Sequence, residues 1–304
     1  MQGYDKAIWG CAKGGIIMDY KDSKWASQIL MLQHDDGSWG HFHTLSNPTK
    51  AQPITTEQAL RRLRILGFTK EDEPICRAIR YMEMNLANPE PTVFHEKKHD
   101  SKTYGDLMLA TWLHLFEPDN ELALKIAKKW ATIVETAFSD GTYSQDGYAS
   151  AYEMVVGKKL SPKAGCLANF VVFYQVVLLQ GVLSAETESL VLDYILNYPT
   201  GMVYIYSKRL RDLPDVFASK QANQYLSAIE LLIGYADAAK KLKFVAAWLA
   251  ENRGSDGLWD MGAAVKDGIH FPLSDSWRNP VDRKADCTYR VENLLRAIGG
   301  TQNV

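Results

Sequence analysis

Apolar side chains recur at helical spacing along most of the chain, in stretches that polar loops separate. An apolar residue at every third or fourth position puts one face of a helix against a core. Strand patterns are rare, 201–206 being the one convincing candidate, and βα alternation is absent. We therefore expect an all-α fold with helices at 25–32, 55–67, 73–86, 104–116, 122–138, 166–183, 185–198, 220–236, 242–251 and 285–299.

A repeated unit organises these helices into pairs. Asp-Gly-x-Trp occurs at 36–39 and again at 256–259, each time after one helix and before a loop that leads to a second helix ending in glycine. A weaker copy, Asp-Gly-Thr-Tyr, occurs at 140–143. Asp-Gly favours a tight turn, and the following aromatic side chain can pin the loop against neighbouring helices. Two further pairs lack the turn, so the sequence predicts five helical hairpins.

Residues at the ends of the expected helices support these boundaries. Thr55 or Thr56 and Asp286 stand where an N-cap side chain would accept a backbone N–H at a helix start. Gly67 and Gly299 stand where a left-handed residue would end a helix. The first and last hairpins are therefore expected to begin and end in similar ways.

The second helix of each pair is the more apolar one, most clearly over 170–179. A helix that is apolar nearly all round is buried on several sides. We therefore expect a single domain, 1–304, in which apolar second helices form an inner layer and more charged first helices an outer layer. An open solenoid is the alternative packing, but the near-matching first and last repeats favour a closed ring because solenoids end in atypical caps.

Composition and charge narrow the function. The chain is 46% hydrophobic and 23% charged, as in a globular protein with a sizeable core. A net charge of −2 and the absence of a long basic block argue against nucleic acid as a partner. We expect the short basic runs at 61–64 and 240–243 to be solvated helix faces.

Cysteine spacing and the N-terminus bear on the compartment. Cys11, Cys76, Cys166 and Cys287 lie far apart and form no CxxC, so neither a zinc ribbon nor a disulfide framework is indicated. The first residues lack a basic segment followed by an apolar one, and no apolar stretch is long enough to be a transmembrane segment. These features predict a cytoplasmic protein.

The segment Leu-Gln-x-x-Asp-Gly-Ser-Trp-Gly at 32–40 resembles the Gln-Trp repeat of squalene and hopene cyclases, and is similar to the repeat of protein prenyltransferase β subunits. The resemblance covers the chain as a pattern of hairpins. It implies an α/α toroid of five to six helical hairpins around an aromatic-lined cavity, with a small isoprenoid or otherwise apolar molecule as ligand. An enzyme of the terpene-cyclase or prenyltransferase kind is the leading hypothesis.

The chain departs from both families at their catalytic motifs. The Asp-x-Asp-Asp of the cyclases is absent, and Asp286-Cys287 differs in spacing from the zinc-binding Asp-x-Cys of the prenyltransferases, with no later histidine. Two alternatives therefore stay open: a non-catalytic binding or scaffold toroid, and a carbohydrate-active α/α barrel. An open groove with several acids would indicate a sugar site, whereas a deep apolar pocket would indicate an isoprenoid site.

Aromatic residues on the presumed inner helices and turns are candidates for the cavity wall. Such rings attract cationic intermediates through cation–π interactions, although core packing is the commoner role of an aromatic at helical spacing. The candidate substrate-binding residues are Trp39, Trp112, Phe173, Tyr174, Tyr225, Trp259 and Tyr289.

Carboxylates near the turns are candidates for acid–base chemistry. Asp140, Asp146 and Asp256 each precede a glycine, so a turn is expected to account for them. Asp260 and Asp286 have no such explanation, and we take these two as the candidate catalytic residues.

Histidines are the candidate ligands for a divalent metal, although the cofactor itself is not identified. The segment 95–99 matches HExxH, but the prolines before it and its high polarity indicate a loop and not a zinc-binding helix. His41 and His43 flank one residue in an extended loop, and the loop of the next repeat would bring His95 and His99 to the same mouth of the ring.

Overall fold

The computed structural model describes residues 20–43, 49–50, 52–88, 93, 100–161 and 164–299. Within these residues the protein is all-helical, as expected, and contains no strand. The strand candidate at 201–206 is wrong: it forms only isolated bridges, Val172 with Val203 and Met202 with Tyr206. The first half of the chain forms α1 (Lys24–Leu30), α2 (Thr56–Ile65), α3 (Glu73–Ala87), α4 (Ser101–Phe116), α5 (Glu121–Ala137) and α6 (Gln145–Val156).

The described helices of the second half of the chain vary more in length, from four residues to 20. Its elements are the 3₁₀ turn η1 (Gly165–Leu167), α7 (Phe173–Leu178), α8 (Ala185–Asn197), α9 (Lys220–Glu230), α10 (Ala238–Lys241), α11 (Lys243–Glu251), the 3₁₀ turn η2 (Ala263–Val265) and α12 (Pro280–Gly299). All six residues of α7 are buried, in agreement with its apolar sequence. The single long helix expected at 166–183 is wrong, because an irregular segment separates η1 from α7.

Three of the expected helix pairs pack as hairpins. They are α1 with α2, α3 with α4, and α11 with α12. The third pair is different: α5 packs along α6, and α7 packs on α4. The sequence did not predict α6, because the pair Asp146-Gly147 was taken for a turn. It lies instead in the first turn of α6, behind the N-cap Ser144, whose side chain accepts the amide of Gly147.

Capping residues set the ends of α2 but not those of α12. The Thr55 side chain accepts the amide of Gln58 and the Gln58 side chain accepts the amide of Thr55, a reciprocal capping box. Gly67 follows α2 with φ of +97°, as predicted. Asp286 is not an N-cap, since it lies inside α12, and Gly299 belongs to that helix without a positive φ.

The two Asp-Gly-x-Trp turns have the same hydrogen bonds. In the first, the Trp39 indole donates to the carbonyl of Ile29 at 2.8 Å and the Trp39 amide donates to the Thr56 hydroxyl at 3.0 Å. In the second, the Trp259 indole donates to Leu249 at 2.7 Å and its amide to the Thr288 hydroxyl at 3.0 Å. Each tryptophan therefore joins the two helices of its hairpin, as the repeat predicts.

Glycine is required at the first of these turns. Gly37 has a φ of +90°, and a Cβ atom there would lie 2.4 Å from the carbonyl oxygen of Arg77 on α3. A larger residue at this position would clash with α3, so the first hairpin packs this closely on the second only with glycine in the turn.

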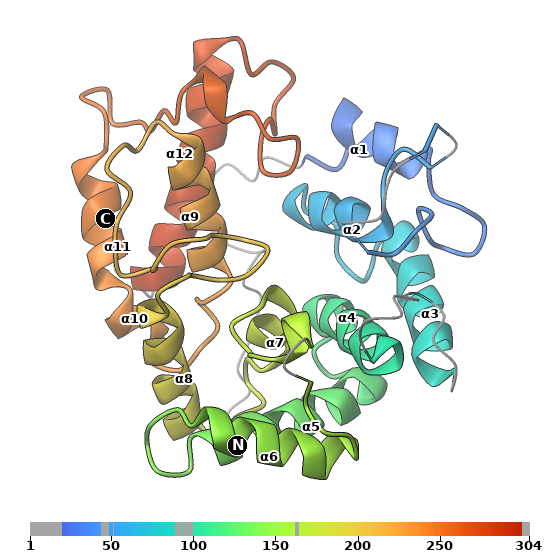
Figure 1. Cartoon of the computed structure of the whole chain (residues 1–304). Coiled ribbons are helices and arrows are strands. Elements are labelled where there is room, and N and C mark those ends of the chain that lie inside the picture. The colour runs from blue at the N-terminus through green and yellow to red at the C-terminus, as the bar shows by residue number, and fades with distance from the viewer. Residues whose placement is uncertain are drawn as a thin grey trace.

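The first and last described parts of the chain meet. Figure 1 shows the elements following one another around the molecule, so that the segment before α12 comes to lie near α1 and α2. The Trp25 indole donates to the carbonyl of Ser274 at 3.0 Å, and the rings of Tyr20 and Tyr289 contact each other edge to face at 5.6 Å. The Arg62 guanidinium of α2 donates to the carbonyl of Ile269 at 2.6 Å and to that of Pro272.

Within the described residues, Cys76, Cys166 and Cys287 are free thiols. Cys11 lies outside these residues. None of the described helices is both long and apolar enough to cross a bilayer.

Candidate functional site

A cavity of about 360 Å³ lies among the helices. Its walls come from α2, α4, α7, α9 and α12, together with residues 204–205 and the segment 265–273 before α12. Its volume falls at the small end of the range of ligand pockets, roughly 300 to 1,000 Å³. A small molecule is therefore the size of ligand that it can hold.

One wall of the cavity is aromatic and carries a cation. Trp112 and Phe173 line it with their rings 5.6 Å apart, and the Arg61 guanidinium lies 4.9 Å from the Phe173 ring and 6.0 Å from the Trp112 ring. Arginine stacked on an aromatic face in this way keeps its charge while its stem is covered. The wall thus offers apolar contact and positive charge side by side.

A buried carboxylate holds this aromatic wall in place. Glu57 of α2 accepts the Trp112 indole N–H at 2.7 Å and the Tyr174 hydroxyl at 2.9 Å, and Glu57 is fully buried. Burial, followed by the nearby Glu57 charge, raises the pKa of Tyr174 well above its usual value. Glu57 and Tyr174 do not line the cavity but fix the orientation of Trp112, which does.

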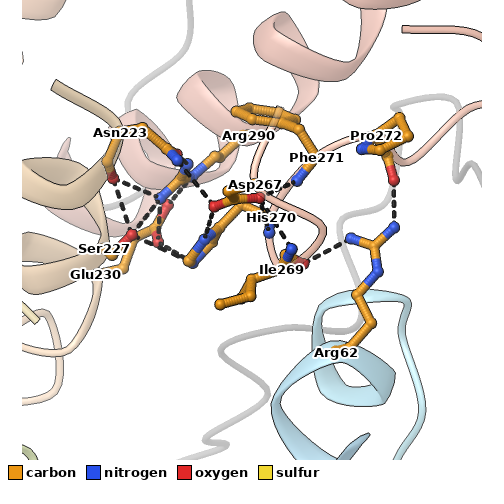
Figure 2. Close-up of polar contacts among 10 residues, drawn as sticks. All are labelled: Arg62, Asn223, Ser227, Glu230, Asp267, Ile269, His270, Phe271, Pro272 and Arg290. Atoms are coloured by element: carbon orange, nitrogen blue, oxygen red, sulfur yellow. Dashed lines mark hydrogen bonds and ion pairs between the residues drawn. The ribbon is translucent and has the colours of Figure 1, made fainter. Parts of the chain in front are cut away.

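Another part of the cavity wall is a hydrogen-bonded polar cluster, drawn in Figure 2. Arg290 of α12 and Glu230 of α9 form a paired ion contact, with nitrogen–oxygen distances of 2.6 and 2.9 Å. Their side chains are only 6% and 9% exposed. Arg290 also donates to the amide oxygen of Asn223 and, at 3.1 Å, to the hydroxyl of Ser227.

His270 connects this cluster to the segment before α12. Its Nδ1 lies 3.1 Å from Asp267 Oδ2, and its Nε2 lies 3.3 Å from Ser227 Oγ and 3.9 Å from Glu230 Oε2. Burial, reinforced by the charge of Arg290, lowers the pKa of His270 below its usual value despite the two nearby carboxylates. The imidazole is therefore neutral near pH 7.

Asp267 positions the histidine. Its Oδ1 accepts the amides of Ile269, His270 and Phe271, and its Oδ2 accepts the Asn223 side-chain amide at 2.8 Å. These hydrogen bonds and the histidine contact hold the pKa of Asp267 far below its usual range, although burial acts in the opposite direction. An ionised Asp267 makes Nδ1 the protonated nitrogen of His270 and leaves Nε2 as an acceptor.

Positive charge is in excess around the cavity. Its lining contains five cationic side chains, those of Arg61, Arg64, Lys220, Lys266 and Arg290, against the two carboxylates of the polar cluster. Burial lowers the pKa of Arg64 to about 10, so this side chain remains charged at neutral pH. An anionic group would be attracted to this site.

The basic run at 61–64 is therefore not a solvated helix face. Arg61 and Arg64 line the cavity, and Arg62 is 4% exposed and bonded to the segment before α12. The basic run at 240–243 was also expected to be a solvated helix face. Lys241 departs from this expectation, since its side chain is 13% exposed and pairs with Asp193 at 2.6 Å.

Three of the seven predicted substrate-binding aromatics line the cavity: Trp112, Phe173 and Tyr289. The remaining four are buried outside its lining. Trp39 and Trp259 join the helices of the two hairpins, and Tyr174 bonds Glu57. Tyr225 donates its hydroxyl to the carbonyl of Leu210 at 3.1 Å and packs edge to face on Trp248.

Neither predicted catalytic acid is among the cavity-lining residues. Asp260 pairs with Arg283 through contacts of 2.7 and 2.8 Å, and these hydrogen bonds lower the pKa of Asp260. Asp286 is fully buried and accepts the amides of Leu273 and Ser274 at 2.8 and 3.0 Å. Both carboxylates hold the segment that leads into α12.

The four predicted metal ligands are not seen together. His41 is exposed, whereas His43 is 7% exposed with its Nε2 3.4 Å from the Tyr104 hydroxyl. His95 and His99 lie outside the described residues. Among the residues that the structure does describe, no three histidine, cysteine or carboxylate side chains form a group that could hold a metal ion.

The polar cluster was not predicted from the sequence. One signal for it was present: Asn223, Ser227 and Glu230 are spaced four and three residues apart, which puts three polar side chains on one face of a helix expected to be internal. The contributions of Asp267, His270 and Arg290 left no comparable pattern, since two of these residues lie in a loop.

The chain was also compared with known proteins. No family model, curated protein or solved structure matches it.

Proposed function

We propose that the protein binds, and acts on, a small amphipathic ligand of the isoprenoid type, with an apolar body and one anionic group. The observation that carries this proposal is the cavity itself, where the aromatic wall of Trp112 and Phe173 lies beside an excess of cationic side chains. An apolar body gains free energy by leaving water, and the anionic group gains by lying among arginines and lysines.

The origin of the cavity walls supports an α/α toroid with two layers. The lining side chains of helices belong to α2, α4, α7, α9 and α12, all within the segments expected to form the inner layer. The first helices of the pairs, α1, α3, α5, α8 and α11, contribute none. The contact of α2 with the segment before α12 supports a closed ring over an open solenoid.

The wall chemistry favours this ligand over a carbohydrate. A sugar site needs an acid and a base that are free to act on the glycosidic bond. Here Glu230 is committed to Arg290 by two contacts, and Asp267 accepts three backbone amides and the Asn223 side chain. An anionic amphiphile needs no free acid or base, because it would contact the aromatic wall and the cationic side chains of the lining.

Titration calorimetry tests the proposal with geranyl phosphate, geranic acid and geraniol as probes. We expect the two anions to bind and the uncharged alcohol to bind at least about 10-fold more weakly, a difference of roughly 1.4 kcal/mol. Arg61→Gln should remove most of this preference, because Arg61 is the cation stacked on the aromatic wall. Comparison of geranyl phosphate with geranic acid shows whether a phosphate or a carboxylate is preferred.

Arg278→Gln is the matched control, because Arg278 is exposed and does not line the cavity. It should leave all three affinities unchanged. The proposal is wrong if none of the probes binds, or if geraniol binds as tightly as the two anions.

A further inference from the structure

A hydroxyl, an imidazole and a carboxylate are aligned in the wall of the cavity. The Ser227 hydroxyl of α9 lies 3.3 Å from His270 Nε2, and His270 Nδ1 lies 3.1 Å from Asp267 Oδ2. Ser227 and His270 both line the cavity. Figure 2 shows the two side chains next to each other in the polar cluster. This is the order of groups in which a serine becomes a nucleophile: carboxylate, base, hydroxyl.

The histidine is oriented for the role of base. Asp267 accepts from Nδ1 and leaves the lone pair of Nε2 directed at Ser227, on an imidazole that burial keeps neutral. The segment that carries His270 is held at both sides of it. Arg62 of α2 donates to the carbonyls of Ile269 and Pro272, and Asp286 accepts the amides of the next two residues.

Arg290 adds a positive charge at the hydroxyl oxygen. Its Nη2 lies 3.1 Å from Ser227 Oγ, and the paired contact with Glu230 fixes the direction of the guanidinium. A cation at this distance stabilises negative charge that develops on the oxygen as its proton leaves. In the resting protein the hydroxyl donates to the carbonyl of Asn223 at 2.8 Å, and rotation of the O–H bond redirects the proton toward His270.

We propose that Ser227, His270 and Asp267 form a hydrolytic acyl-transfer centre for carboxylic esters whose apolar part occupies the cavity. The inference rests on the proposed function, because the same apolar wall would hold the substrate. It also deepens that function, since hydrolysis of such an ester releases an apolar carboxylic acid, which is an amphipathic anion.

The step uses only the ester and water. Ser227 Oγ bonds to the ester carbonyl carbon while its proton passes to His270 Nε2; the carbon–oxygen bond to the alcohol then breaks, and the alcohol leaves with that proton. Water attacks the resulting acyl-serine, giving one proton to His270 and the hydroxyl to the acyl carbon. The free acid leaves, and Ser227 regains its proton from His270. Asp267 keeps its charge throughout and acts as a positioning residue.

Two measurements on the full chain test the centre: covalent labelling by an octyl fluorophosphonate, read by peptide mass spectrometry, and hydrolysis of p-nitrophenyl octanoate. We expect one phosphonyl group on Ser227, and labelling that slows as the pH falls and His270, which faces Asp267, Glu230 and Arg290, gains a proton. Ser227→Ala and His270→Asn should each lower kcat/KM by roughly 100-fold or more.

Ser27→Ala is the matched control for Ser227→Ala. Ser27 is an exposed helical serine whose hydroxyl also bonds the carbonyl four residues before it, so its loss should change neither labelling nor hydrolysis. Circular dichroism melts of all variants separate a lost hydroxyl from a lost fold, and a folded His270→Gln variant replaces His270→Asn if the latter does not fold.

The outcomes separate the two proposals. If the amphipathic anions bind but Ser227 is neither labelled nor needed for hydrolysis, the acyl-transfer centre is wrong and the binding function stands. Labelling of Ser227 that persists in a folded His270 variant at the wild-type rate also overturns the centre. If neither anion binds while Ser227 is labelled in a His270-dependent way, the amphiphile proposal is wrong.

Discussion

At the scale of single residues, burial sets the charge state of the groups around the cavity. The neutral His270 and the charged Arg64 show the same effect, since burial opposes the charged form of each, but only the histidine has a usual pKa close enough to neutrality to lose its proton. The state of the polar cluster near pH 7 therefore follows from the position of His270 in the fold.

The first prediction concerns pH and His270. Because the pKa of His270 is lowered from 6.5 in the folded protein, the unfolded chain binds more protons below that pH, and stability falls as the solution is acidified. The decrease should be at most about 1.4 kcal/mol per pH unit for this one group. Urea unfolding at pH 7.5 and 5.5 measures it, and His270→Gln should flatten the dependence.

His41→Gln is the control for this experiment, because His41 is exposed. It should leave the pH dependence as in the unaltered protein. A flat pH profile in the unaltered protein, or a slope that His270→Gln leaves in place, would contradict the assignment.

Part of the cavity wall could be predicted from residue type and helical position alone. Trp112, Phe173 and Tyr289 were found because large aromatics on presumed inner helices are natural lining residues. Asp260 and Asp286 were singled out because no turn explained them, yet both hold backbone or ion-pair contacts that lie outside the cavity lining. A carboxylate that stabilises a loop has the same local sequence as one that acts on a substrate.

At the scale of elements, the Asp-Gly-x-Trp turns unite a local rule with a tertiary contact. The turn is encoded by the Asp-Gly pair, but the tryptophan amide is satisfied by a threonine hydroxyl on the following helix, 17 residues away in the first hairpin and 29 in the second. The threonines Thr56 and Thr288 thus connect turn and helix, and the repeat could be recognised without them.

The second prediction tests this connection. Thr288→Val should lower the free energy of unfolding by about 1–3 kcal/mol, because it leaves the buried amide of Trp259 without an acceptor. Thr288→Ser keeps the hydroxyl and should retain most of the stability. Guanidinium unfolding of the three proteins gives the values, and equal stability of the valine and serine variants would show that the hydroxyl is not what matters.

The Asp-Gly pair, which correctly marked the turns, also misled the prediction of one helix. Asp-Gly at 140–141 is a turn, with φ of +76° at Gly141, whereas Asp-Gly at 146–147 lies inside α6. Glycine allows a turn without requiring one, and the packing of α6 on α5 offsets its low helix propensity. The expected pairing of α5 with a helix at 166–183 was therefore wrong, although α5 itself was predicted.

At the scale of the whole molecule, one arginine joins the beginning of the chain to its end. Arg62 is 4% exposed, and burial lowers the pKa of Arg62 to about 10, so it reaches the carbonyls of Ile269 and Pro272 as a cation. Charge-assisted hydrogen bonds of this kind are stronger than neutral ones. The contact holds the segment that carries His270 against α2.

The third prediction is that Arg62→Met loosens the contact between α2 and the segment before α12. The free energy of unfolding should fall by about 1–3 kcal/mol, and amide hydrogen exchange should become faster in 265–275 than elsewhere. Arg278→Met changes an exposed arginine in the same way and should alter neither quantity. Unchanged exchange over 265–275 in the Arg62 variant would show that other contacts hold the segment.

The sequence by itself determined most of the helices, the Asp-Gly-x-Trp turns and the apolar character of the segments that line the cavity, because these depend on spacing within a few residues and on local capping. Only the tertiary structure decided where the polar chemistry lies. Ser227 and Arg290 are 63 residues apart, and Arg62 is 207 residues from Ile269. Buried polar groups need hydrogen-bond partners, and here these partners come from segments far apart in the sequence. The site therefore exists only in the folded chain.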